Sequence, residues 1–133
     1  YTTIFLENRF DESQSLIVQA EVADEPDEIA LGLMNRKKLA KNKGMLFVYN
    51  NPSAPQFWMK NTIISLDILF TDYTGQIIQI FENVPKMSEK KITAGGGVSF
   101  VLEINSGIVK KFKIDYNWTL NFSDFFKSLK PFC

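Results

Sequence analysis

The stretch from Leu66 to Phe81 constrains the fold more than any other part of the chain. Two runs of mainly apolar residues, 66–71 and 76–81, flank the sequence Asp-Tyr-Thr-Gly, and Gly75 can take the positive φ that a tight turn needs. Runs of this length on either side of such a turn are typical of a β-hairpin. A chain that contains this hairpin needs further strands to cover it.

Other short runs of β-branched and aromatic residues supply those strands. They predict strands at 2–6, 16–22, 45–49, 98–104 and 117–122, the first two paired as a hairpin across a loop at 7–15. Helical spacing predicts short helices at 24–34, capped by Asp24, and at 105–113, capped by Asn105 or Ser106, with a third at 124–129. Repeated alternation of strands and helices is absent. We therefore expect an α+β fold, mainly β, with a mostly antiparallel sheet closed on itself as a small barrel or sandwich and two or three short helices.

Length and composition indicate one domain over residues 1–133. The chain is 45% hydrophobic with 12 Phe, enough for one core of this size, and no linker interrupts it. Its single cysteine, Cys133, cannot form an intramolecular disulfide. No apolar run is long enough to span a bilayer. The chain begins at Tyr1 rather than Met, from which we expect that an upstream segment was removed.

Charge and histidine content narrow the chemistry. The 15 basic and 15 acidic residues cancel, so no overall field steers the chain to nucleic acid or to an anionic membrane, and we expect no nucleic-acid partner. Short basic runs such as Lys90-Lys91 and Lys110-Lys111 leave room for a local basic patch. The chain has no histidine, which removes the commonest general base and most zinc sites. We expect no cofactor, no metal site and no catalytic residue of the histidine-dependent kind.

Several blocks of sequence together resemble the family called domain of unknown function 192. The blocks are Glu21-Val22-Ala23-Asp24, Gly32-Leu33-Met34-Asn35-Arg36, Gly44-Met45-Leu46-Phe47-Val48, Phe57-Trp58-Met59-Lys60-Asn61-Thr62, Leu66-Asp67-Ile68-Leu69-Phe70, Gly75, Asn83-Val84-Pro85, Val101-Leu102-Glu103-Ile104 and Gly107. The resemblance covers about residues 16–120. It implies a small bacterial or archaeal domain, mainly β, often exported, with no established activity. On this basis we expect an exported protein, with a cytoplasmic location as the alternative.

The chain departs from the family pattern near its C-terminus. Many relatives have a Gly-Asp turn before the last strand, where this chain has Tyr116-Asn117-Trp118, and an aromatic tail, predicted as a helix within 123–132, is extra.

Trp58, Lys60, Asn61 and Thr62 are the first candidate for a binding site. A cation, an amide and a hydroxyl beside a Trp ring can hold a small polar ligand, and Trp with Lys suits a sugar or a carboxylate. The alternative is structural, with Lys60 lying along the surface and Asn61 stabilising a turn.

Arg36 is the second candidate, because lysine is used at nearly every other basic position. Its planar guanidinium can pair with a ligand anion through two hydrogen bonds. The favoured alternative is an internal partner, either Glu21 or Asp67.

Three acids, Glu21, Asp67 and Glu103, lie inside predicted strands. Two carboxyl groups facing each other could perform acid–base chemistry, although acids on the solvent face of a strand are commoner.

These residues support three hypotheses for function. The leading one is a non-catalytic binding or accessory module with a small polar pocket around Trp58, Lys60, Asn61 and Arg36. The second is a carboxylate-based hydrolase acting on a sugar-like substrate. The third is a protein-interaction domain that uses the tail residues Phe125, Phe126 and Phe132.

Overall fold

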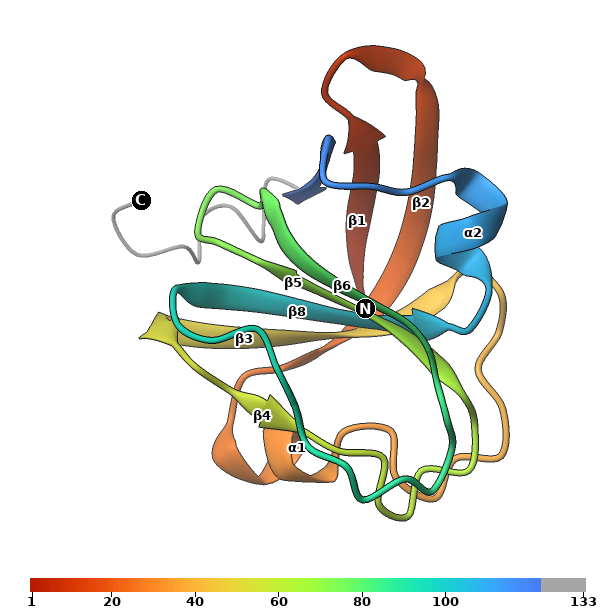
Figure 1. Ribbon diagram of the computed structural model, residues 1–133, viewed down its shortest axis with the longest axis vertical. Helices are drawn as coiled ribbons and strands as arrows, with labels where there is room; N and C mark the ends of the chain where they lie inside the picture. Colours follow the sequence, from red (N-terminus) through yellow and green to blue (C-terminus); the bar gives the residue numbers. More distant parts are fainter. Residues whose placement is uncertain (123–133) are drawn as a thin grey trace.

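Strands dominate the structure, a computed structural model that describes residues 1–122. In chain order the elements are β1 (Thr2–Asn8), β2 (Asp11–Ala23), α1 (Pro26–Leu31), β3 (Lys43–Ser53), β4 (Gln56–Phe57), β5 (Leu66–Thr71), β6 (Ile77–Val84), β7 (Ile92–Thr93), β8 (Val98–Asn105), α2 (Ile108–Phe112) and β9 (Trp118–Phe122) (Figure 1). The prediction of a mainly β fold with few short helices is confirmed.

Seven of the strands form one strongly curved mixed sheet. Its order is β6-β5-β8-β3-β2-β1-β9, and β4 pairs with β7 in a separate two-stranded sheet. Within the large sheet only β2 and β3 run parallel, because α1 lies in the connection between them. The edge strands β6 and β9 approach each other through a single bridge between Gln76 and Thr119. The sheet is therefore not closed, and the predicted barrel is not supported.

The β1–β2 hairpin is longer than the sequence indicated. The predicted loop at 7–15 is mostly strand, with a turn at Arg9 and Phe10, so that prediction was wrong. The outer part of the hairpin projects from the sheet (Figure 1). Both of its faces meet solvent there, so its sequence lacks the alternation of apolar and polar residues that marks a half-buried strand.

Helix α1 is shorter than predicted and is capped by Glu25 rather than Asp24. Glu25 and Glu28 form a reciprocal capping box, and Pro26 fits the first turn. The helix stops at Gly32, whose φ of 51° turns the chain away.

The β5–β6 hairpin is confirmed with the predicted turn. Asp72 accepts a hydrogen bond from the Thr74 N–H at 2.9 Å, and Gly75 has a φ of 89°. A Cβ atom at Gly75 would lie 2.1 Å from the Leu120 carbonyl oxygen, so this position needs glycine for space as well as for φ.

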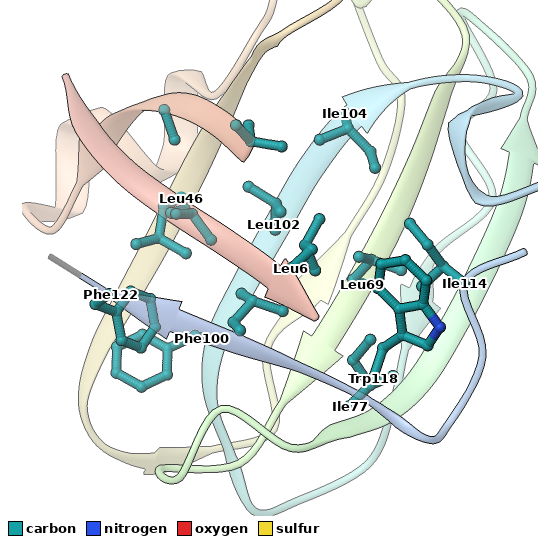
Figure 2. Packing of buried hydrophobic residues seen from close by; sticks show 14 of the residues in the cluster. Leu6, Leu46, Leu69, Ile77, Phe100, Leu102, Ile104, Ile114, Trp118 and Phe122 are labelled. Carbon is teal, nitrogen blue, oxygen red and sulfur yellow. The ribbon is translucent and has the colours of Figure 1, made fainter. Parts of the chain in front are cut away.

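The curved sheet has a hydrophobic core on each face of its central strands. Inside the curve, Trp118 packs beside Leu69, Ile77 and Ile114 (Figure 2). On the opposite face, Phe57 of β4 forms edge-to-face pairs with Phe47 and with Phe70. Both faces of β5 are consequently buried.

Candidate functional site

Three connecting segments meet below the sheet, at residues 33–43, 58–65 and 85–91, which we call the loop end. The Asn35 N–H donates to the Asn61 carbonyl at 2.8 Å and joins the first two segments. The Met87 N–H donates to the Thr62 carbonyl at 2.8 Å, and the Met59 N–H donates to the Ser88 carbonyl at 2.9 Å. Residues far apart in sequence are thereby held beside one another (Figure 1).

Several residues at the loop end have a positive φ, which is a strained backbone conformation for most side chains. Asn35, Asn61 and Met87 all have a positive φ, of 64°, 58° and 64°. Asparagine tolerates this conformation well, whereas methionine adopts it rarely. In the turn from Met59 to Thr62, Asn61 is the third residue, where a type II turn requires a positive φ. Strained backbone of this kind is concentrated at functional sites in other proteins, so the loop end is a candidate site.

Trp58 and Lys60 are exposed on this turn. Trp58 is 38% exposed, and the Lys60 ammonium lies 5.1 Å from the centre of its ring. A cation over the face of an indole is attracted by the ring electrons. The two side chains therefore present an apolar surface and a positive charge to solvent at one place.

Thr62 is buried and serves the turn. Its N–H donates to the Met59 carbonyl at 3.0 Å, and its hydroxyl is 3.4 Å from the Lys60 carbonyl. Of the predicted polar cluster, Thr62 is thus the member whose side chain is turned away from solvent.

Arg36 pairs with Glu21, as the structural alternative for this residue predicted. Its Nη2 donates to Glu21 Oε1 at 2.9 Å and its Nη1 donates to Oε2. These hydrogen bonds hold the pKa of the Glu21 carboxyl below its usual value and raise the pKa of Arg36. Both side chains remain about one third exposed, so the pair also faces solvent.

Asp67 is fully buried and accepts three backbone hydrogen bonds. Its Oδ1 accepts from the Asn83 N–H at 2.8 Å, and its Oδ2 accepts from the Gly107 and Val109 N–H groups at 3.1 and 2.9 Å. The start of α2 is therefore capped by Asp67 of β5 and not by Asn105 or Ser106, contrary to the sequence prediction.

Glu103 is buried in β8, opposite Met45 of β3 and Ile68 of β5. None of the residues in 1–122 donates a hydrogen bond to its carboxyl. Burial raises the pKa of Glu103 to about 8, so the carboxyl is protonated at neutral pH. Tyr49 packs against the hydrophobic core that contains Met45 and Ile68. Its pKa rises to about 12, mainly through burial and then through the charge of Glu103.

The three acids do not form one cluster. Glu21 and Glu103 share a face, each directly opposite Met45, with β3 between their strands. Asp67 points to the other face, because its neighbour Ile68 is the residue opposite Glu103. The expectation of solvent-facing acids was wrong for Asp67 and Glu103. Both of these side chains are buried.

Sequence reasoning missed two features of the loop end. The positive φ of Met87 has no sequence signal, since methionine is not a turn residue. The basic residues of 33–43 and 85–91 were visible as runs, but only the fold brings them beside Lys60. The predicted tail helix, the tail residues Phe125, Phe126 and Phe132, and Cys133 lie outside the described residues.

The described residues hold neither a metal-binding cluster nor a membrane-spanning helix. Within residues 1–122, no group of three acidic or thiol side chains could hold a metal ion. No helix in that range has the length and apolar character needed to cross a membrane.

The fold and the loop end define a small mixed-β domain with a strained, polar loop cluster beside its sheet. The family model for domain of unknown function 192, described as Uncharacterized ACR, matches residues 8–122. The chain belongs to this family, as the sequence blocks indicated. No curated protein matches it.

Among the solved structures that share the fold, two are more than 30% identical to this chain. One, from Sinorhizobium meliloti 1021 and described as a "putative transcription regulator", is 32% identical with a TM-score of 0.87, over 91% of this chain and 92% of the other. The second, a protein of unknown function from Novosphingobium aromaticivorans DSM 12444, is 31% identical with a TM-score of 0.83, over 90% and 83%. These similarities extend the fold to proteins of two bacteria and assign no activity to this chain.

Proposed function

We propose that this domain is a non-catalytic binding module for a small, negatively charged polar ligand held at Trp58, Lys60, Asn61 and Arg36. One observation carries the proposal. The hydrogen bond from the Asn35 N–H to the Asn61 carbonyl places the segment with Arg36 beside the turn with Trp58 and Lys60.

The side chains favour a sugar acid as the ligand. Lys60 supplies an exposed positive charge, and Arg36 keeps donors beyond the two that Glu21 accepts. The Trp58 ring supplies an apolar face against which a sugar ring can lie, and Asn61 supplies a neighbouring amide. A carboxylate on a hydroxylated ring uses all of these groups.

The alternative functions have less support. Both carboxyl oxygens of Glu21 and both of Asp67 already accept hydrogen bonds from within the chain, which argues against a carboxylate-based hydrolase. The description of the Sinorhizobium relative as a transcription regulator suggests binding of nucleic acid. The balanced net charge of this chain argues against such binding. Export of the protein and an interaction through its C-terminal tail remain proposals, and these observations add no support to either.

Tryptophan fluorescence offers a direct test, because Trp58 is partly exposed and Trp118 is fully buried. Titration with glucuronate should change the emission of Trp58, whereas neutral glucose should act much more weakly. Lys60→Gln should lose at least about tenfold in affinity, the value of one charge-assisted hydrogen bond.

Lys111→Gln is the matched control, because Lys111 also lies over an aromatic ring, that of Phe112, but on α2. Equal affinity of Lys60→Gln and the wild type for glucuronate would remove the basis of the proposal. So would a wild type that binds neither sugar.

A further inference from the structure

Charge is strongly segregated at the loop end, although the chain as a whole is neutral. The three segments 33–43, 58–65 and 85–91 contain one acid, Glu89. Their exposed lysines are Lys37, Lys38, Lys41, Lys60, Lys86, Lys90 and Lys91. Within residues 1–122 the only ion pair joins Arg36 and Glu21, so these lysines have no anionic partner among those residues. Seven unpaired positive charges therefore surround the three segments.

Large apolar side chains are exposed among these lysines. Ile63 is 40% exposed and Met87 is 52% exposed, and Trp58 lies on the same pair of segments. The hydrogen bonds that join 59–62 to 87–88 keep the segments with Ile63 and Met87 together. Met87 is held in a strained backbone conformation, which places an apolar side chain at the tip of a turn where asparagine or glycine would be easier.

Apart from Glu89, a group of acids lies to one side of the three segments. Four of them, Asp24, Glu25, Asp27 and Glu28, surround the start of α1, and Figure 1 shows α1 at the lower left with the three segments to its right. A negatively charged surface would therefore attract the molecule with its lysine-rich side first.

We propose that the loop end docks on the surface of an anionic lipid bilayer, with Ile63 and Met87 entering the headgroup region and the lysines contacting anionic headgroups. Exposed apolar residues on the same segments as exposed lysines are a combination that peripheral membrane proteins use. Trp58 suits the same boundary, because an indole is apolar on its faces and polar at its N–H.

Nucleic acid is the less favoured anionic partner. Binding of single strands relies on several aromatic rings that stack on bases, whereas Trp58 is the only aromatic residue in the three segments and Glu21 occupies Arg36. Ile63 and Met87 would contribute nothing to phosphate binding. This inference goes beyond the proposed ligand site and can be tested with residues that are not part of it.

Vesicle co-sedimentation of the purified protein tests the inference. Vesicles of phosphatidylcholine with roughly one third phosphatidylglycerol should bind the protein in low salt, and pure phosphatidylcholine should bind it far more weakly. Binding should weaken as ionic strength passes about 0.1 M, where the screening length falls to about 10 Å.

Two pairs of variants separate the contributions. Replacing Lys86, Lys90 and Lys91 together by Gln should weaken binding about a hundredfold, since each lysine near an anionic surface contributes roughly a factor of five. The matched control replaces the exposed lysines Lys110, Lys111 and Lys113 of α2 and its end by Gln, and should bind like the wild type.

Met87→Asn keeps a residue that tolerates positive φ and removes the apolar side chain, so it should weaken vesicle binding several-fold. Tyr73→Asn, which changes a 51% exposed side chain in the β5–β6 turn, should not.

Equal loss in both lysine variants would overturn the inference, as would no difference between the two kinds of vesicle. Tight binding to a single-stranded oligonucleotide without binding to anionic vesicles would also overturn it. A protein that binds anionic vesicles but not glucuronate would contradict the proposed ligand site and would still support membrane docking.

Discussion

The buried acid in the sheet makes a quantitative prediction about pH. Glu103 has no described hydrogen-bond partner, and burial raises its pKa from 4.5 to about 8. In the unfolded chain the carboxyl returns to its ordinary pKa. Between these two pKa values the native state therefore binds more protons than the unfolded state, and stability must fall as pH rises.

The size of this effect follows from the two pKa values. Each unit of difference corresponds to 1.36 kcal/mol, and most of the interval from 4.5 to 8 lies between pH 5 and pH 9. The free energy of unfolding should consequently fall by about 4 kcal/mol over that range because of Glu103 alone. Glu103→Gln has nearly the same size and cannot ionise, so it should lose this part of the pH dependence.

Urea denaturation of the wild type and of Glu103→Gln at pH 5, 7 and 9 measures the effect. The free energies of unfolding of the two proteins should differ least at pH 5. As pH rises, the variant should become steadily more stable relative to the wild type. Glu82→Gln, at an exposed position of β6, is the control and should leave the slope unchanged. Parallel pH profiles for the wild type and Glu103→Gln would refute the reasoning and would mean that the carboxyl ionises without penalty.

Three further substitutions test the local geometry. Asp67→Asn should destabilise by about 3 kcal/mol in urea denaturation, because one amide oxygen cannot satisfy the three backbone N–H donors that the buried carboxylate serves; a loss below about 1 kcal/mol would contradict this assignment. Gly75→Ala should cost about 3 kcal/mol or more, since its Cβ would collide with the Leu120 carbonyl, and unchanged thermal stability would disprove the contact. Met87→Gly should raise stability by about 1 kcal/mol by relieving positive φ, and a loss of stability would show that the side chain packs more than its exposure indicates.

Local pattern was sufficient for the fold where side chains alternate between core and solvent or where a turn has a strong signal. The β5–β6 hairpin and its Gly75 turn are the clearest case. It was insufficient for the outer β1–β2 hairpin, whose exposed faces have no apolar alternation. The parallel pairing of β2 with β3 also escaped prediction, because it depends on how α1 returns the chain to the sheet.

The candidate site shows the same division. The composition alone marked Arg36 as unusual, and its pairing with Glu21 was one of the two partners predicted. The roles of Asp67 and Glu103 depend on contacts between distant parts of the chain, such as Asp67 with Gly107, and on burial by several strands, which no local pattern contains. The concentration of lysines at the loop end likewise arises only when three distant segments meet.

Backbone NMR of the isotope-labelled protein during titration with glucuronate tests the proposed binding site most directly. The amide signals of 58–62 and of Asn35 and Arg36 should shift together with one saturation curve, because the hydrogen bond between Asn35 and Asn61 joins these segments. Shifts that occur elsewhere in residues 1–122, or no shifts at saturating sugar, would contradict the site.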